Sequence, residues 1–421
     1  MTNAPRLPAP TPGDTVTCPL HTTGACSSCP HLDTPVALQL AGKQERVTAV
    51  LGDRVPDGAW LPPAASAPER FRNRAKMAVS GTSAHPVLGI LDRDGRGTDL
   101  RTCPLHLHQI EEVLPVLARL VTALHLTPYD VRSRRGELKY VLVTASPDGE
   151  LMVRLVLRST RHVPALREAT AHLQRLVPGL AVFSVNIQPQ PAAVIEGERE
   201  IVLSRRSDLP MRLTLPSLGT EGRVDGGPSV VLPLHLPPRS FFQTNTGVAQ
   251  ALYGQARTWA ADDGGAGGSD GERPQVVWDL YCGVGGFALA LAGSGRRVRG
   301  VEVSANAIEG ARRAAVEMGL GPELVGFEAG DATVLDPATG VRSGASPDLL
   351  VVNPPRRGIG AELAVRVETS GVRRVLYSSC NPVSLARDLE AMPSLRVARA
   401  RLFDMFPHTD HAEVLVELRR V

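Results

Sequence analysis

A single cysteine stands where the chain must turn after a predicted strand. The stretch YSSCNP places Cys380 directly behind the strand-like run RRVLY at residues 373–377. A lone thiol is usually a small buried hydrophobe. At the carboxyl end of a strand, however, a side chain faces the crevice in which open α/β sheets bind their ligands. Cys380 is therefore a candidate nucleophile, with packing as the alternative.

A glycine-rich turn lies between a predicted strand and a predicted helix at DLYCGVGGF, residues 279–287. Gly283 and Gly285 let the backbone turn tightly and approach a ligand. Glu302 ends the next predicted strand, where its carboxylate can accept hydrogen bonds from two ribose hydroxyls. The pattern Gly283-x-Gly285-x-x-Ala288 also fits a dinucleotide-binding fingerprint, which by itself is a weak signal.

The motif Asn353-Pro354-Pro355 separates these two hypotheses. NAD enzymes share the glycine turn but have no reason for this motif at the end of the fourth strand. In amino- and base-modifying methyltransferases, an (Asp/Asn)-Pro-Pro motif lines the site between the methyl donor and the acceptor. A plain proline-rich strand exit is the structural alternative. Together with the glycine turn and the acidic strand end, the motif resembles that of S-adenosylmethionine (AdoMet) methyltransferases.

A thiol beside a methyl donor has a specific use. Uracil C5 is too weak a nucleophile to take a methyl group unaided, whereas addition of a thiolate to C6 makes an enolate that reacts at C5. A general base must then remove the C5 proton before the thiol can leave. The stretch FDMFPHTDHAEV offers Glu413 at the start of a predicted strand that would hold it rigidly. We expect its neighbours His408, Asp410 and His411 to shape the loop.

These motifs resemble the RNA (uracil-5)-methyltransferase family over nearly the whole chain. SFFQTN, DLYCGVGGF, VEV, NPPRRGIG, YSSCNP and FDMFPHTDHAEV occur in the family's order. The resemblance implies that Cys380 is the nucleophile and Glu413 the base. It also implies AdoMet as the cofactor, bound by Gln243, Tyr281, Gly283, Gly285, Glu302, Asp331 and Asn353. The amide of Gln243 can both donate and accept at the methionine end, and Asp331 would meet the adenine.

Four further cysteines suggest a metal site. Cys18, Cys26 and Cys29 crowd together near the start, and Cys103 lies far downstream. Four thiolates can hold zinc or an iron–sulfur cluster, and the spacing does not separate the two. Four unrelated buried cysteines are the alternative. The ribosomal RNA members of the family carry a [4Fe–4S] cluster on such cysteines, so the resemblance implies this cluster here in an architectural role.

The patterns along the chain predict an α/β protein built from several parts. We expect a disordered start at 1–15, an iron–sulfur segment with a basic patch at 16–120, a central α+β RNA-binding domain with an antiparallel sheet at 121–240, and a Rossmann-like class I AdoMet methyltransferase domain at 241–421. In the last part strands alternate with helices, which indicates a mostly parallel sheet.

Composition narrows the setting of the protein. The net charge of +3 does not by itself indicate nucleic-acid binding. There is no apolar run of membrane-spanning length and no apolar signal core at the start, so we expect a cytoplasmic protein without a membrane partner. The six cysteines then do not form a disulfide framework. With no coiled-coil pattern or apolar stripe, we expect a monomer.

The resemblance also narrows the RNA. Several relatives that modify another ribosomal uridine have an N-terminal β-barrel, for which this chain has no room, and the transfer RNA enzymes lack the cluster. The expected substrate is a loop uridine of 23S ribosomal RNA, at position 747 in the usual numbering. Another 23S uridine (position 1939), both uridines, or a transfer RNA are alternatives. Two alternatives belong to other classes of protein. A non-catalytic RNA-remodelling protein is disfavoured because Cys380 and Glu413 are both present. An oxidoreductase is disfavoured because no nicotinamide or flavin motif appears.

Basic residues of the first two parts are candidates for phosphate contacts. They are Arg70, Arg72, Arg74, Lys76, Arg132, Arg134, Arg135 and Lys139. For any single one a solvated surface charge is the simpler interpretation, but as a group they favour RNA. Tyr140 or Phe71 could stack on a splayed base. The target base must leave its stack before Cys380 can reach C6, which favours an RNA loop.

Overall fold

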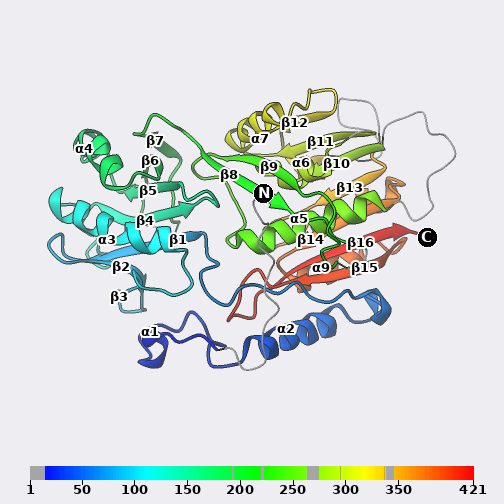
Figure 1. Ribbon diagram of the computed structural model, residues 1–421, viewed down its shortest axis with the longest axis horizontal. Helices are drawn as coiled ribbons and strands as arrows, with labels where there is room; N and C mark the ends of the chain where they lie inside the picture. The colour runs from blue at the N-terminus through cyan, green and yellow to red at the C-terminus, as the bar shows by residue number, and fades with distance from the viewer. Residues whose placement is uncertain are drawn as a thin grey trace.

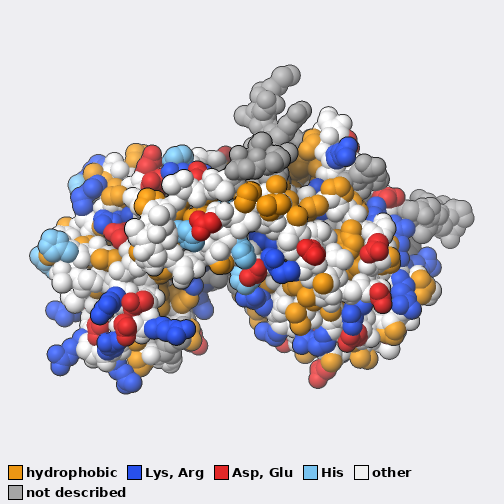
Figure 2. Space-filling model, turned by 90° about the horizontal axis from the view of Figure 1, so that it is seen from below, with side chains coloured by type: hydrophobic (Ala, Val, Ile, Leu, Met, Phe, Trp, Pro, Cys, Tyr) orange, Lys and Arg blue, Asp and Glu red, His pale blue; other side chains and the backbone are white. Residues whose placement is uncertain are grey.

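The computed structural model describes residues 15–191, 194–219, 222–262, 275–293, 295–335, 337 and 346–421. Apart from Thr15, the predicted disordered start therefore lies outside the described residues. The chain forms two lobes (Figure 1). In the space-filling view of Figure 2 a notch separates them. Within the described ranges, no helix is both long and apolar enough to cross a membrane.

The first lobe contains a sheet with the strand order β3-β2-β1-β4-β5-β6-β7 in the described part of the chain (Figure 1). Its strands are β1 (Arg74–Gly81), β2 (Pro86–Leu91), β3 (Gly97–Asp99), β4 (Leu138–Ala145), β5 (Leu151–Leu157), β6 (Leu180–Ile187) and β7 (Arg199–Val202). Neighbouring strands are antiparallel except β5 and β6, which run parallel because helix α4 (Val163–Leu176) connects them. Helix α3 (His108–Ala123) shares one hydrophobic core with α4.

The sheet crosses the domain boundary predicted at residue 120. Strands β1 to β3 come from the predicted iron–sulfur segment, yet β1 pairs with β4 from Arg74 opposite Thr144 to Ala78 opposite Tyr140. The sequence analysis read the start of β1 only as a basic patch. Its burial nevertheless alternates, with Ala75, Met77 and Val79 inside. A strand with charged residues on its outer face looks polar in sequence and still buries one side.

The second lobe is the predicted α/β domain. Its sheet has the order β12-β11-β10-β13-β14-β16-β15 among the described residues. The strands are β10 (Gln275–Leu280), β11 (Arg296–Glu302), β12 (Val325–Ala329), β13 (Leu349–Val352), β14 (Arg374–Ser379), β15 (Leu395–Phe403) and β16 (Glu413–Arg420). Strands β10 to β14 are parallel, and β16 is antiparallel to both β14 and β15. The expectation of a mostly parallel sheet is confirmed.

Helices cover both faces of this sheet. They are α5 (Thr246–Ala261), α6 (Gly286–Leu291), α7 (Ala305–Glu317), α8 (Gly360–Thr369) and α9 (Pro382–Glu390). Alternate strand residues enter different cores: Val277 joins the layer of α5, α6 and α7, whereas Trp278 joins the layer of α8 and α9. Burial on both sides explains why the parallel strands read as continuous apolar runs. The short 3₁₀ turn η3 (Ala332–Val334) follows β12.

Two further segments connect the lobes. The hairpin of β8 (Leu209–Leu215) and β9 (Val230–Leu236) belongs by sequence to the predicted central domain but packs on α5 and α7. At the other end of the chain, α1 (Pro19–Thr22) lies beneath the first lobe and α2 (Val36–Leu51) beneath the second, where it contacts α9 (Figure 1). The 3₁₀ turns η1 (Gly52–Arg54) and η2 (Asp57–Ala59) follow α2.

Candidate active site

A cavity of about 680 Å³ opens where the parallel strands end. Tyr281 follows β10, Glu302 ends β11, Asn353 follows β13 and Cys380 follows β14. The remaining predicted residues that line it are Gln243, Gly283, Asp331 and Glu413. The carboxyl ends of parallel strands share one edge of the sheet, so residues far apart in sequence converge there.

The glycine turn has the strained backbone that its sequence predicts. Tyr281 has φ +63°, Gly283 +54° and Gly285 +87°, a region that favours glycine. Gly285 does not line the cavity. It caps α6, and a Cβ there would lie 3.1 Å from both Ala311 and Phe327. Its contribution is therefore the shape of the turn rather than a wall of the cavity.

Two carboxylates hold this turn. Glu302 accepts the N–H of Gly283 at 3.3 Å and the N–H of Ser304 at 3.0 Å, which fixes its carboxylate at the cavity wall. Asp279, inside β10, accepts the N–H of Ala288 at 2.8 Å. Burial raises the pKa of Asp279 to about 8. Asp279 thus anchors α6 from within the protein, whereas Glu302 faces the cavity.

Cys380 and Glu413 lie at adjacent ends of two antiparallel strands and line the same cavity. The ladder between β14 and β16 ends with Ser379 opposite Val414, and Cys380 and Glu413 are the residues next to this last pair. Burial, and then the charge of Glu413, raise the pKa of the Cys380 thiol to about 11, while Arg356 acts in the opposite direction. Burial raises the pKa of Glu413 to about 7, and a hydrogen bond from the Ser378 hydroxyl opposes this rise. A buried carboxyl that titrates near neutrality suits a general base.

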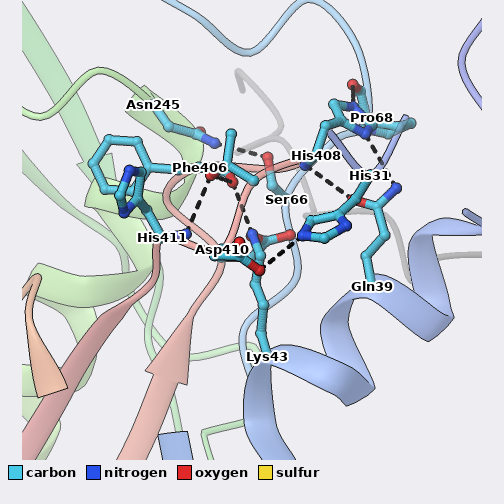
Figure 3. A network of polar contacts seen from close by, with 12 residues as sticks. His31, Gln39, Lys43, Ser66, Pro68, Asn245, Phe406, His408, Asp410 and His411 are labelled. Atoms are coloured by element: carbon cyan, nitrogen blue, oxygen red, sulfur yellow. Dashed lines mark hydrogen bonds and ion pairs between the residues drawn. The ribbon is translucent and has the colours of Figure 1, made fainter. Parts of the chain in front are cut away.

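The loop before Glu413 is held by residues from the first part of the chain (Figure 3). The N–H of His408 donates to the Gln39 side chain on α2 at 2.9 Å, and its Nε2 lies 2.7 Å from the Pro68 carbonyl. Asp410 pairs with His31 at 2.7 Å. These contacts agree with the expectation that His408 and Asp410 shape the loop.

Helix α2 also fixes the part of this loop that reaches the cavity (Figure 3). Lys43 is buried, pairs with Asp404 and donates to the Phe406 carbonyl at 2.7 Å. The Phe406 ring lines the cavity. The position of Phe406 therefore depends on a helix from the start of the chain.

Several residues that line the cavity were missed by the sequence analysis. They are Phe241, Phe242, Tyr253, Cys282, Val284, Phe287, Val303, Ala332, Thr333, Arg356, Arg357 and Phe406. Phe241 is 66% exposed although it belongs to the cavity wall. Arg356 and Arg357 stood inside the quoted motif NPPRRGIG, which was the signal that could have identified them.

The four remaining cysteines named above line a separate cavity of about 100 Å³. Cys18, Cys26, Cys29 and Cys103 share it with Arg72. Burial, and then the charges of the other three cysteines, raise the pKa of Cys29 to about 11, and Arg72 opposes this rise. Among the residues that the structure describes, no group of three or more His, Cys, Asp or Glu is arranged to hold a metal ion.

The basic residues proposed for RNA fall into different environments. Lys139 is buried, donates to the Gln190 carbonyl at 2.6 Å and lies over the Tyr129 ring. Phe71 is 6% exposed, so it cannot stack on a base as expected. Arg132, Arg134, Arg135 and Lys76 are exposed. In the face shown in Figure 2, Lys and Arg are spread over both lobes among Asp and Glu.

A parallel sheet with this glycine turn, this acidic strand end and the Asn353-Pro354-Pro355 motif in the cavity wall has the features of a Rossmann-like AdoMet methyltransferase. The family described as tRNA (Uracil-5-)-methyltransferase matches residues 346–421. The 23S rRNA (uracil(747)-C(5))-methyltransferase RlmC of Halothiobacillus neapolitanus is 45% identical over 94% of this chain and 98% of that protein. Its namesake from Pectobacterium atrosepticum is 43% identical over 96% of this chain and 99% of that protein. This chain belongs to the RNA (uracil-5)-methyltransferase family, as its motifs predicted.

A solved structure has the same fold. The tRNA (uracil-54, C5)-methyltransferase of Pyrococcus abyssi, in complex with S-adenosyl-L-homocysteine, matches with a TM-score of 0.69. The match covers 93% of this chain and 85% of that chain at 23% identity. The predicted fold class is confirmed.

Proposed function

We propose that this protein transfers a methyl group from AdoMet to C5 of uridine 747 of 23S ribosomal RNA, giving 5-methyluridine. The observation that carries the proposal is that Cys380 and the buried Glu413 line one cavity, each next to the last paired residues of β14 and β16. The target uridine is taken from the names of relatives that match this chain over almost its whole length. Ribosomal RNA as substrate also favours a cytoplasmic protein, and we propose that it acts as a monomer.

The cavity wall suits AdoMet. Glu302 keeps its carboxylate at the end of β11, where free lone pairs can accept from ribose hydroxyls. Gly283 has space for a ligand, since a Cβ there would meet no atom within 4 Å. The further residues that we assign to AdoMet are Gln243, Tyr281, Asp331 and Asn353, while Gly285 shapes the turn. When bound, AdoMet supplies an electrophilic methyl group.

Cys380 and Glu413 divide the remaining chemistry. As the bond from Cys380 Sγ to uracil C6 forms, the thiol proton passes to water and the C5–C6 electron pair moves onto the C4 carbonyl as an enolate. The C4 carbonyl then re-forms as C5 takes the methyl group, and the electron pair of the broken S–CH3 bond stays on the sulfur of the donor. Glu413 next accepts the C5 proton. The C5–C6 double bond then re-forms, and the bond between Sγ and C6 breaks to release the thiolate. The charge of Arg356 lowers the pKa of Cys380. It therefore favours the thiolate both in the first step, when the thiolate adds to C6, and in the last step, when the thiolate is released.

The mouth of the cavity suits an unstacked base. Phe241 exposes two thirds of its surface there, and an exposed ring can stack on a base that has left its RNA stack. Arg356 and Arg357 line the same cavity and offer guanidinium groups to phosphates. An apolar ring beside two cations suits RNA better than a small neutral substrate.

We assign a [4Fe–4S] cluster to Cys18, Cys26, Cys29 and Cys103. The thiols fit it chemically, because four of them line one small cavity and their like charges oppose one another as thiolates. Arg72 beside them offsets negative charge. A zinc ion on the same thiols is the alternative, and iron and acid-labile sulfide analysis of anaerobically purified protein separates the two.

Methylation of defined RNA tests the proposed function. Purified protein is incubated with labelled AdoMet and ribosomal RNA that lacks 5-methyluridine, and the label is mapped, with Cys380→Ala as control. We expect label at uridine 747 and none with the variant. Label at position 1939 or in transfer RNA would keep the chemistry and change the substrate. Absence of label from every RNA despite normal AdoMet binding would favour a non-catalytic RNA-remodelling protein.

A further inference from the structure

A short segment separates the cysteine cavity from the cavity of Cys380. At Arg72 the segment is hydrogen-bonded to residues that follow Cys103. The N–H of Arg72 donates to the Leu105 carbonyl at 2.8 Å, and the Arg72 carbonyl accepts the N–H of Leu107 at 3.1 Å. One residue further, the N–H of Asn73 donates to the Thr244 carbonyl at 2.9 Å. Arg72 thus contacts the wall of the cysteine cavity, and Asn73 contacts the residue next to Gln243.

The side chain of Asn73 points toward Gln243, which lines the cavity of Cys380. Asn73 is 1% exposed. Its Nδ2 donates to the Gln243 carbonyl at 2.9 Å and to the Thr246 hydroxyl at 2.8 Å. Its own carbonyl accepts the N–H of Ala145 from β4 at 2.8 Å. Asn73 therefore links the sheet of the first lobe to the residue that we assign to the methionine end of AdoMet.

The segment that Asn73 holds has little other regular support. Residues 241–244 lie in no helix or strand, and α5 begins only at Thr246. Gln243 is 4% exposed and lines the cavity. In an irregular segment, side-chain hydrogen bonds rather than a backbone ladder set the direction in which a side chain points. The bond to the Gln243 carbonyl needs a donor, and aspartate, whose carboxylate only accepts, cannot provide one, although the Thr246 hydroxyl could still donate to it.

We infer that Asn73 is a positioning residue for methyl transfer, which holds the Gln243 backbone so that the Gln243 amide meets the methyl donor. The inference rests on the proposed function, since it requires that Gln243 contact AdoMet. It differs from the RNA-binding role that the basic stretch around Asn73 suggested, because Asn73 is buried and faces the cofactor side. The effect of Asn73 must then appear in AdoMet affinity and must depend on the Gln243 side chain.

A double-mutant cycle on the full-length protein tests this dependence. The variants are Asn73→Ala, Asn73→Asp, Gln243→Ala and the double variant Asn73→Asp with Gln243→Ala. AdoMet affinity is measured by isothermal titration calorimetry, and stability by thermal unfolding. We expect each Asn73 variant to weaken AdoMet binding by about tenfold, the size of one buried hydrogen bond. The double variant should bind no more weakly than Gln243→Ala alone.

Asn186 provides a matched control. It is also fully buried, and its Nδ2 donates to a backbone carbonyl, that of Gly197, at 3.1 Å, and to Glu200 at 2.8 Å, in the sheet of the first lobe. Asn186→Ala should lower the unfolding temperature as Asn73→Ala does but leave AdoMet affinity within about twofold. A general loss of packing would instead affect both variants alike.

Three results would overturn the inference. Normal AdoMet affinity in both Asn73 variants, with only the unfolding temperature lowered, would reduce Asn73 to a structural residue. Additive losses in the double variant would mean that Asn73 acts elsewhere than through Gln243. Normal AdoMet affinity in Gln243→Ala would remove the assigned role of Gln243 in the proposed function, and the inference with it. The Gln243 single variant therefore separates failure of the assignment from failure of the inference.

Discussion

Cys29 and Cys380 are partly buried thiols in two different cavities, and in both cases burial raises the pKa to about 11. Their neighbours differ. Cys29 shares its cavity with three other cysteines, whose charges would repel one another as thiolates, so the four would ionise together only with a cation beside them. Cys380 shares a much larger cavity with the carboxyl group of Glu413. Since the two thiols have a similar pKa, it is their neighbouring groups that support the proposal of a metal ligand at one and a nucleophile at the other.

The largest expected effect is that of removing the single thiol. Cys380→Ala should lower methyl transfer by at least about 10⁴-fold, because no covalent bond to uracil C6 can form. AdoMet binding and iron content should stay unchanged, since both depend on other residues. Single-turnover transfer of labelled methyl groups measures the loss. Activity within tenfold of the wild type would mean that Cys380 is a packing residue and not a nucleophile, so that the proposed difference between Cys380 and Cys29 would not hold.

Replacing the base should arrest the reaction later. In Glu413→Gln we expect turnover to fall by about 10²- to 10⁴-fold, the usual contribution of a general base. Methylated RNA should stay attached to Cys380, visible as a protein–RNA band that survives denaturing electrophoresis. Free methylated RNA at the normal rate would assign proton removal to another group.

The same variant should also be more stable than the wild type in alkaline solution. The folded pKa of Glu413, about 7, lies above its ordinary value of 4.5, so native-state stability is lost as the pH rises through 7. Glutamine does not ionise. The variant should therefore gain up to about 3 kcal/mol at pH 8 and little at pH 5. Denaturant unfolding at both pH values measures this difference.

Replacing one of the four clustered cysteines should lower the stability of the protein more than its methyltransferase activity. Cys29→Ser should remove most of the iron and lower the unfolding temperature, since bound metal contributes directly to folding. We expect only a several-fold loss of activity, transmitted through the segment of Arg72 and Asn73. Iron analysis and melting curves test this, with Cys380→Ala as the control that should keep its iron. A loss of activity as large as that of Cys380→Ala, at full stability and iron content, would contradict the division between the two sites.

A smaller effect concerns the pH at which the base works. Turnover requires ionised Glu413 to remove the C5 proton, so the turnover rate should rise with pH through about 7. The Ser378 hydroxyl lowers the pKa of Glu413, and Ser378→Ala should move this rise to higher pH and slow the reaction at pH 7 by a few-fold. Ser379→Ala is the matched control, because its hydroxyl bonds to the Asn381 backbone instead. Identical pH–rate profiles for both variants would exclude Glu413 as the titrating group.

The smallest effect should come from the third kind of thiol. Cys282 is buried in the core beside the glycine turn, and burial raises its pKa. Cys282→Ala should change methyl transfer by less than about threefold and cost about 1 kcal/mol of stability from lost packing. Steady-state kinetics and denaturant unfolding measure the two quantities. A loss of several hundredfold would show that a second thiol takes part in the reaction.

Much of the fold could be predicted because the pattern of local burial was clear. The predicted strand that ends at Glu302 and the predicted strand that starts at Glu413 agree with the structure. Strands β1 and β15 were missed because arginine and lysine alternate with their buried residues and hide the apolar face. Among the site residues, Arg356 was passed over although its motif was recognised. Lys139 was expected at the surface and is buried, because a single basic residue does not reveal which face of its strand it occupies.

The residue types that end each strand can be read from the sequence: a glycine turn after β10, Glu302 at the end of β11, Asn353 after β13 and Cys380 after β14. These are local properties, set by hydrophobic periodicity and turn chemistry. Which of these residues meet depends on the tertiary structure. It places Glu413 and Cys380 in one cavity, brings the distant Cys103 to the three cysteines near the start and directs Asn73 toward the Gln243 carbonyl. Such meetings depend on strand order and on packing between segments far apart in sequence, and local patterns carry no record of either.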